Sequence, residues 1–147
     1  MDPTNPIVRL CIEGMTAESR GHPEEASRCF DRAWQAAGED YERCIAAHYV
    51  ARHQPSEVDR MTWNRRALEA ADRVGDGRVS TLYPSLLLNL GHSLEVTGDP
   101  DGARNLYLRA RRWAEGLPRD AYGTMVLGGI EAGLDRIGAQ GPGDADS

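Results

Sequence analysis

The chain has 147 residues, of which 40% are hydrophobic and 27% are charged, an ordinary balance for a globular protein with a hydrophobic core. Acidic residues outnumber basic ones by 23 to 17, so the formal net charge is −6, which disfavours nonspecific nucleic-acid binding. No apolar run approaches the ~20 residues that a membrane-spanning helix needs, and the N-terminal residues lack the order of a signal peptide. We therefore expect a cytoplasmic protein without membrane contact.

The recurrence of Ala, Leu, Arg and Glu at three- and four-residue steps predicts an all-α fold, because strands would show a two-residue alternation that this sequence lacks. Glycine and proline divide the chain into seven predicted helices. In chain order these are 6–20, 23–37, 39–52, one that follows Ser56 and reaches about 74, one that ends at 97, one that ends near 115, and 119–137. Ser56 and Asp59 resemble a capping box with a shorter acid.

We expect a single helical domain over residues 1–137. The tail, residues 138–147, has no apolar residue that could anchor it to a core, so it is predicted to be disordered.

Motifs that carry chemistry are missing from the sequence. The three cysteines, Cys11, Cys29 and Cys44, lie inside helical patterns and lack CxxC spacing, which favours reduced core residues over disulfides or a zinc site. The segments "GDGR" and "GDPDG" stand where helices must break, so we interpret them as turns and not as phosphate or calcium loops. We predict no catalytic residue, no metal and no cofactor.

Residues 87–113 carry the most informative spacing in the chain. Two leucines and a glycine are followed at fixed distances by glycine, alanine and tyrosine: Leu87, Leu90, Gly91, Gly98, Ala103, Tyr107 and Ala110. This stretch resembles a tetratricopeptide repeat, a helix–turn–helix unit of thirty-four residues. In such a unit the small residues let two helices approach closely, and the large residues fill the seam between them.

The same pattern recurs in the first part of the chain. Counting from Ile7, the corresponding residues are Leu10, Gly14, Gly21, Ala26, Phe30 and Ala33, with Glu13 in place of the expected leucine. A middle unit follows, because Ala67 stands one repeat length after Ala33, although its first helix is degenerate. The interval from Ala67 to Ala110 is nine residues longer than the repeat, so the segment around residues 74–84 either lengthens the flanking helices or forms a loop.

The resemblance covers about residues 7–117. It implies a right-handed α-solenoid of about three repeats, followed by a C-terminal capping helix. The seventh predicted helix fits the cap because its apolar residues follow one stripe, namely Tyr122, Val126, Ile130, Leu134 and Ile137.

Proteins of this family bind other proteins or peptides in a concave groove that the first helices of the repeats line. The resemblance therefore implies a protein- or peptide-binding adaptor or regulatory module. The residues at the groove positions are Met15, Glu18, Tyr49, Arg52, His53, His92 and Glu95. We expect Tyr49, Arg52 and His92 to be partly exposed on one face. Cys11, Ile45 and Leu88 stand at a further groove position and are equally consistent with packing.

Three alternatives stay open. The first is a small helical enzyme or small-ligand-binding protein with a pocket in the concave furrow. The second is a homodimeric scaffold, since Gly129 and Gly133 form a smooth strip that a second helix could approach closely. The third concerns the arginines of the sixth predicted helix and of the strip at Arg60, Arg65 and Arg66, which form either a solvated face or a surface for an anionic partner.

Overall fold

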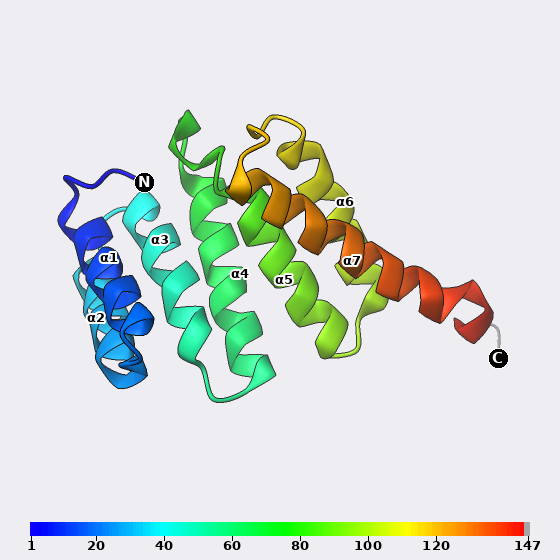
Figure 1. The fold of residues 1–147 in the computed structure, drawn as a ribbon, viewed down its shortest axis with the longest axis horizontal. Helices are drawn as coiled ribbons and strands as arrows, with labels where there is room; N and C mark the ends of the chain where they lie inside the picture. The colour runs from blue at the N-terminus through cyan, green and yellow to red at the C-terminus, as the bar shows by residue number, and fades with distance from the viewer. Residues whose placement is uncertain (146–147) are drawn as a thin grey trace. The chain divides into compact units, whose positions relative to one another are not determined.

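The structure, a computed structural model, describes residues 1–145, with side chains described up to residue 139. Within this range the chain forms seven α-helices, two short 3-10 helices and no strand, which confirms the all-α prediction (Figure 1). The α-helices are α1 (Pro6–Ser19), α2 (Pro23–Ala36), α3 (Asp40–Val50), α4 (Glu57–Arg73), α5 (Tyr83–Val96), α6 (Pro100–Ala114) and α7 (Ala121–Ala145). The 3-10 helices are η1 (Ala51–His53) and η2 (Gly77–Val79). None of the described helices is long and apolar enough to cross a membrane.

The chain divides into two compact units, the first formed by residues 1–79 and the second beginning at Ser80, where the sequence suggested one domain. Each unit is described by itself. In the first, α1 pairs with α2 and α3 pairs with α4, and α3 also packs on both α1 and α2. In the second, α5 pairs with α6, and α7 packs on both of them.

The hairpins α1–α2 and α5–α6 are built alike. In each, an aromatic ring of the second helix covers a glycine of the first: Phe30 covers Gly14, and a Cβ added to Gly91 would lie 3.0 Å from the Tyr107 ring. The same added Cβ would lie 3.5 Å from the carbonyl oxygen of Ala103, so Gly91 and Ala103 meet across the helix pair as the spacing predicted.

The turns of these two hairpins also correspond. Gly21 and Gly98 have φ values of 76° and 95°, a left-handed conformation that favours glycine. Pro23 and Pro100 follow in the first turns of α2 and α6, where a missing N–H costs nothing. The two reversals therefore follow from the same local chemistry.

The middle hairpin, α3–α4, replaces this glycine–ring pair. His48 and Asn64 stand where the pattern places glycine and the aromatic residue, and Asn64 is buried. Burial, helped by the charge of Arg52, lowers the pKa of His48 to about 4. Because His48 is larger than glycine and polar, this hairpin with its degenerate sequence cannot repeat the packing of the other two.

Helix ends agree with the sequence to within a few residues, apart from the last. Ser56 caps α4 by accepting a 3.1 Å hydrogen bond from the Asp59 N–H, as the capping motif predicted. The extra residues after α4 form a loop that contains η2, so they do not extend α4 and α5 into longer helices. Helix α7 continues to Ala145, beyond the predicted end at Ile137; residues 146–147 of the predicted tail lie outside the described residues.

The apolar stripe of α7 is buried at Val126, Ile130 and Ile137, whereas Tyr122 is exposed. The glycine strip of α7 faces the chain's own helices. A Cβ at Gly129 would lie 3.0 Å from Leu88, and one at Gly133 would lie 2.5 Å from Tyr107. The expectation that this strip offers a smooth surface to a second copy is therefore wrong, because α5 and α6 already occupy it.

Candidate functional site

Four of the predicted groove residues meet in the first unit, where α1 packs on α3. The Glu18 carboxylate accepts a 2.7 Å hydrogen bond from Arg52 Nη1 through Oε1, and its Oε2 lies 2.8 Å from His53 Nε2. The Arg52 guanidinium carbon lies 4.8 Å from the centroid of the Tyr49 ring. We call Glu18, Tyr49, Arg52 and His53 the Glu18 cluster.

The Glu18 cluster forms because the C-terminal ends of α1 and α3 lie side by side. Glu18 lies in the last turn of α1, and Arg52 and His53 lie in η1, directly after α3. A carboxylate that bonds two cationic or proton-donating groups fixes both, and charge-assisted bonds of this length are the stronger kind. Arg52 nevertheless keeps 45% of its side-chain surface exposed, so its guanidinium is oriented and still accessible.

Tyr49 is buried, with 7% of its surface exposed, so the expectation of a partly exposed ring is wrong for this residue. Its ring stacks on Phe30 with centroids 5.3 Å apart, and the His48 ring meets it edge-on at 4.9 Å. Phe30 also stacks on His53 at 5.7 Å. The Arg52 guanidinium therefore packs over the buried Tyr49 ring, and Arg52 is the member of this pair that a partner can contact.

Met15 is half-buried on α1. Cys11 and Ile45, which the sequence left open as groove or packing residues, are buried and therefore serve in packing. Cys11 and Cys44 lie in the core as predicted, and burial raises the pKa of their thiols to about 12, whereas Cys29 is only partly buried.

His92 and Glu95 lie on α5 in the second unit. His92 is exposed, whereas Glu95 accepts hydrogen bonds from Arg136 Nε at 2.8 Å and from the Tyr107 hydroxyl at 2.7 Å. The bond from Arg136 holds the pKa of Glu95 below its ordinary value, against the opposing effect of burial. Glu95 therefore ties α5 to α6 and α7, and it contributes mainly to the packing of this unit.

Sequence reasoning missed Arg136 and Phe30 as partners of the candidate site residues. Nothing in the repeat spacing places Arg136 opposite Glu95, since that pairing depends on how α7 packs on α5. Phe30 was recognised as a packing residue, but its stacking on Tyr49 and His53 joins residues from separate helices and has no signal in the local sequence.

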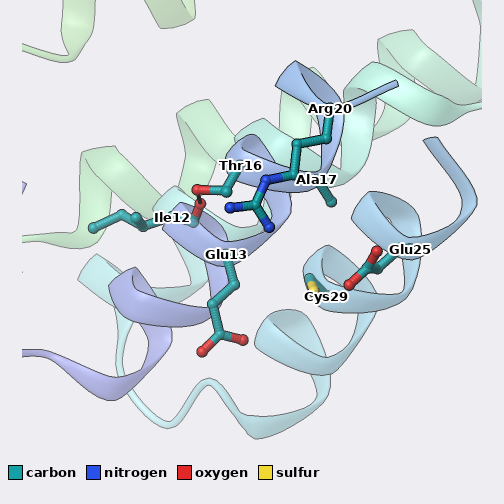
Figure 2. A pocket seen from close by; sticks show the side chains of 7 residues that line it. All are labelled: Ile12, Glu13, Thr16, Ala17, Arg20, Glu25 and Cys29. Atoms are coloured by element: carbon teal, nitrogen blue, oxygen red, sulfur yellow. Dashed lines mark hydrogen bonds between the residues drawn. The ribbon is translucent and has the colours of Figure 1, made fainter. Parts of the chain in front are cut away.

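An open hollow of about 280 Å³ lies between α1 and α2 (Figure 2). Its lining residues come from both helices: Ile12, Glu13, Thr16, Ala17, Arg20, Glu25 and Cys29. None of the predicted groove residues lines it. Burial, with added repulsion from the carboxylates of Glu13 and Glu25, raises the pKa of the Cys29 thiol, which disfavours the thiolate that a nucleophile requires.

No group of three or more histidine, cysteine or acidic side chains is placed to hold a metal ion among the residues that the structure describes. Comparison of the chain with protein families, with curated proteins and with solved structures finds no match.

Proposed function

We propose that this protein is a protein- or peptide-binding adaptor or regulatory module, and that the α1–α3 face with the Glu18 cluster is its binding surface. The observation that carries the proposal is the position of Arg52. Its guanidinium is held between a carboxylate and an aromatic ring while almost half of the side chain stays exposed. A flexible arginine loses conformational entropy when it binds a partner, and an arginine that is already oriented loses less.

The chemistry of Arg52 indicates what the partner offers. A guanidinium has five N–H donors, and Glu18 takes one of them at Nη1. The others can bind carboxylate or main-chain carbonyl oxygens, and arginine is among the residues that contribute most to protein interfaces. We therefore expect a peptide with an acidic side chain or an exposed carbonyl at the point where it meets Arg52.

The proposal includes the arrangement of the helices. We infer that the three hairpins and α7 are tetratricopeptide-like repeats with a cap, stacked as a right-handed solenoid. The shared construction of α1–α2 and α5–α6 supports this, since glycine, ring and turn glycine recur at the same spacing. The cytoplasmic location suggested by the sequence stays a prediction.

The alternatives have less support. None of the predicted furrow residues lines the hollow between α1 and α2, and the thiol that borders it is poorly suited to nucleophilic attack. The homodimeric scaffold stays a prediction without its suggested contact, because Gly129 and Gly133 face Leu88 and Tyr107 of the same chain. Sedimentation at micromolar concentration would test it.

A peptide-display selection on the purified full chain tests the proposal. Selected peptides should bind the Arg52→Ala variant at least about tenfold more weakly, as expected when an interface loses a well-placed arginine. Arg32→Ala is a matched control, because Arg32 is an exposed arginine of α2 outside the Glu18 cluster. Peptides that bind both variants as tightly as the natural chain would contradict the proposed surface.

A further inference from the structure

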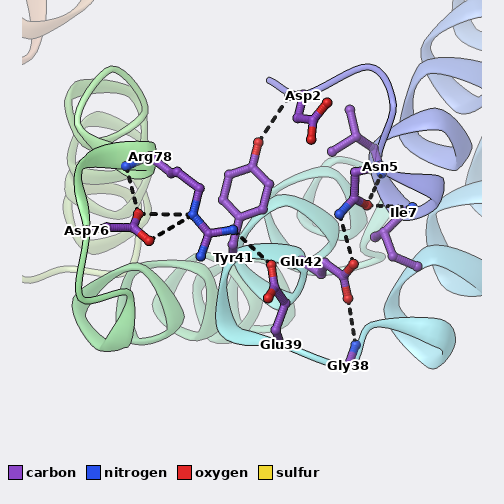
Figure 3. A network of polar contacts seen from close by, with 10 residues as sticks. Asp2, Asn5, Ile7, Gly38, Glu39, Tyr41, Glu42, Asp76 and Arg78 are labelled. Carbon is purple, nitrogen blue, oxygen red and sulfur yellow. Dashed lines mark hydrogen bonds and ion pairs between the residues drawn. The ribbon is translucent and has the colours of Figure 1, made fainter.

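The first residues of the chain lie against α3. The Asp2 N–H donates a 3.2 Å hydrogen bond to the Tyr41 hydroxyl (Figure 3), and the Tyr49 hydroxyl points at Met1 Sδ, 3.8 Å away. Tyr41 and Tyr49 are eight residues apart on α3, so they lie on one face of the helix. We call residues 1–4 the N-terminal strap.

The strap is anchored at its end. Asn5 caps α1 by accepting a 2.8 Å hydrogen bond from the Ile7 N–H, and its Nδ2 donates a 2.9 Å bond to Glu42 of α3. Glu42 in turn accepts a bond from the Gly38 N–H at 2.9 Å. Figure 3 shows this chain of contacts, which fixes the position of the residue that follows the strap.

The Tyr41 hydroxyl that receives the strap is held in place. Its ring is buried under the Arg78 guanidinium, whose carbon lies 4.7 Å from the ring centroid. Arg78 is itself fixed by 3.0 Å contacts with Asp76 and Glu39 (Figure 3). An acceptor in a fixed position is suited to bind a main-chain N–H of any extended segment.

The strap itself is weakly held. Met1 keeps 51% of its surface exposed, and its contact with Tyr49 is an O–H to sulfur contact, a weak kind. Segments with few buried contacts open at little free-energy cost. The strap can therefore leave α3 while the helices stay folded.

Tyr49 belongs both to the strap contact and to the Glu18 cluster. We propose that the strap is an internal peptide on α3, and that a partner peptide displaces it. The partner would be an extended segment whose unbranched apolar side chain takes the place of Met1 and whose main-chain N–H takes the place of the Asp2 N–H at Tyr41. An acidic residue beside them would reach toward Arg52. This proposal rests on the proposed function and specifies its ligand.

The test uses the strap's own sequence as the probe. A peptide of residues 1–6, Met-Asp-Pro-Thr-Asn-Pro, with a dye at its C-terminus, is titrated by fluorescence anisotropy into the full chain and into a chain that lacks residues 1–4. The shortened chain should bind the peptide, and the full chain should bind it about tenfold more weakly, the factor expected if the strap occupies its place nine-tenths of the time.

Two further pairs of variants, each a variant with its matched control, test the proposed contacts. In the full chain, Asp2→Pro removes the N–H that Tyr41 accepts and should raise the affinity for the peptide, whereas Asp2→Asn keeps that N–H and should not. In the shortened chain, Tyr49→Phe should weaken binding. Tyr122→Phe should leave binding unchanged, because that hydroxyl contacts Ser85 and the Thr81 carbonyl in the other unit.

Equal affinity for the full and shortened chains, or binding to neither, would overturn the proposal. A dimer of the full chain that dissociates when residues 1–4 are removed would also overturn it, since the strap would then occupy a second copy. The two proposals can fail separately. If selected peptides still depend on Arg52 while the strap peptide does not bind, the proposed adaptor function stands and only the proposal of an internal peptide is refuted.

Discussion

Gly133 of α7 lies directly against the ring of Tyr107 in α6, so that a Cβ at Gly133 would come within 2.5 Å of Tyr107 Cζ. The hydroxyl of the same tyrosine donates a 2.7 Å hydrogen bond to Glu95 of α5. Tyr107 thus joins the three helices of the second unit. The absence of a side chain at residue 133 is a packing requirement, which explains a glycine that would otherwise weaken the helix.

We predict opposite effects for two glycines of α7. Gly133→Ala should lower the free energy of unfolding by about 1–3 kcal/mol, because the new methyl group overlaps a buried ring. Gly128→Ala should raise it by up to about 1 kcal/mol, because nothing lies within 4 Å of its Cβ position and alanine is the better helix former. Urea unfolding of both variants checks this. Equal destabilisation would contradict the placement of α7.

We expect Ala103→Leu to overpack the seam between α5 and α6. Ala103 is fully buried, and its carbonyl oxygen lies beside Gly91. The cost should be about 1–3 kcal/mol of unfolding free energy. Ala132→Leu, at an exposed position of α7, is the control and should change it by no more than about 0.5 kcal/mol. An unchanged melting midpoint for Ala103→Leu would argue against this helix register.

The Glu95–Arg136 pair should make stability depend on acid. The pKa of Glu95 is lowered in the folded chain, so its contribution is fully present above the unfolded value near 4.5 and is lost as the pH falls through the lower, folded value. Glu95→Gln should lower the free energy of unfolding by roughly 1–2 kcal/mol at pH 7. This is the usual contribution of a hydrogen bond to a charged group, reduced because Arg136 is half exposed to solvent. The gap between variant and natural chain should shrink between pH 5 and pH 2.

The control for this prediction is Glu131→Gln. Glu131 pairs with Arg111 at 3.5 Å on an exposed surface, where an ion pair contributes little. Its loss should change the unfolding free energy by no more than about 0.5 kcal/mol at either pH. A Glu95→Gln deficit that stays constant down to pH 2 would show that the carboxylate charge is not the source.

His48 should make the chain less stable in weak acid. Burial lowers the pKa of His48 to about 4. Below pH 6.5 the His48 side chain is therefore protonated in the unfolded chain and still neutral in the folded chain. Its contribution is therefore complete above pH 6.5 and is lost as the pH falls toward 4. From pH 7 to pH 5 this amounts to about 2 kcal/mol of unfolding free energy.

Urea unfolding of His48→Gln at both pH values checks this, since the variant should lose less stability on acidification than the natural chain. His22→Gln, at an exposed position, should follow the natural chain. Identical pH dependence for all three proteins would contradict the lowered pKa of His48.

Much of the fold follows from local signals in the sequence. The turns at Gly21 and Gly98 and the cap at Ser56 depend on residues only a few positions apart, so their chemistry is legible without knowing the rest of the chain. The Gly91–Ala103 contact was also predictable, because two helices joined by a short turn can pair in few registers and small residues mark the close approach.

The candidate site was predicted only in part, because it depends on contacts between helices. The sequence by itself predicted that Glu18 and Arg52 stand at one groove position of successive first helices and that Tyr49 stands at another. Only the tertiary structure decided that Tyr49 is buried while Arg52 stays exposed, since Phe30, His48 and Met1 reach that ring from other turns and helices. Gly133 shows the same division. Its spacing from Gly129 is visible in the sequence, but whether that strip faces a partner or Tyr107 depends on how α7 packs, and packing is set by side chains far apart in the chain.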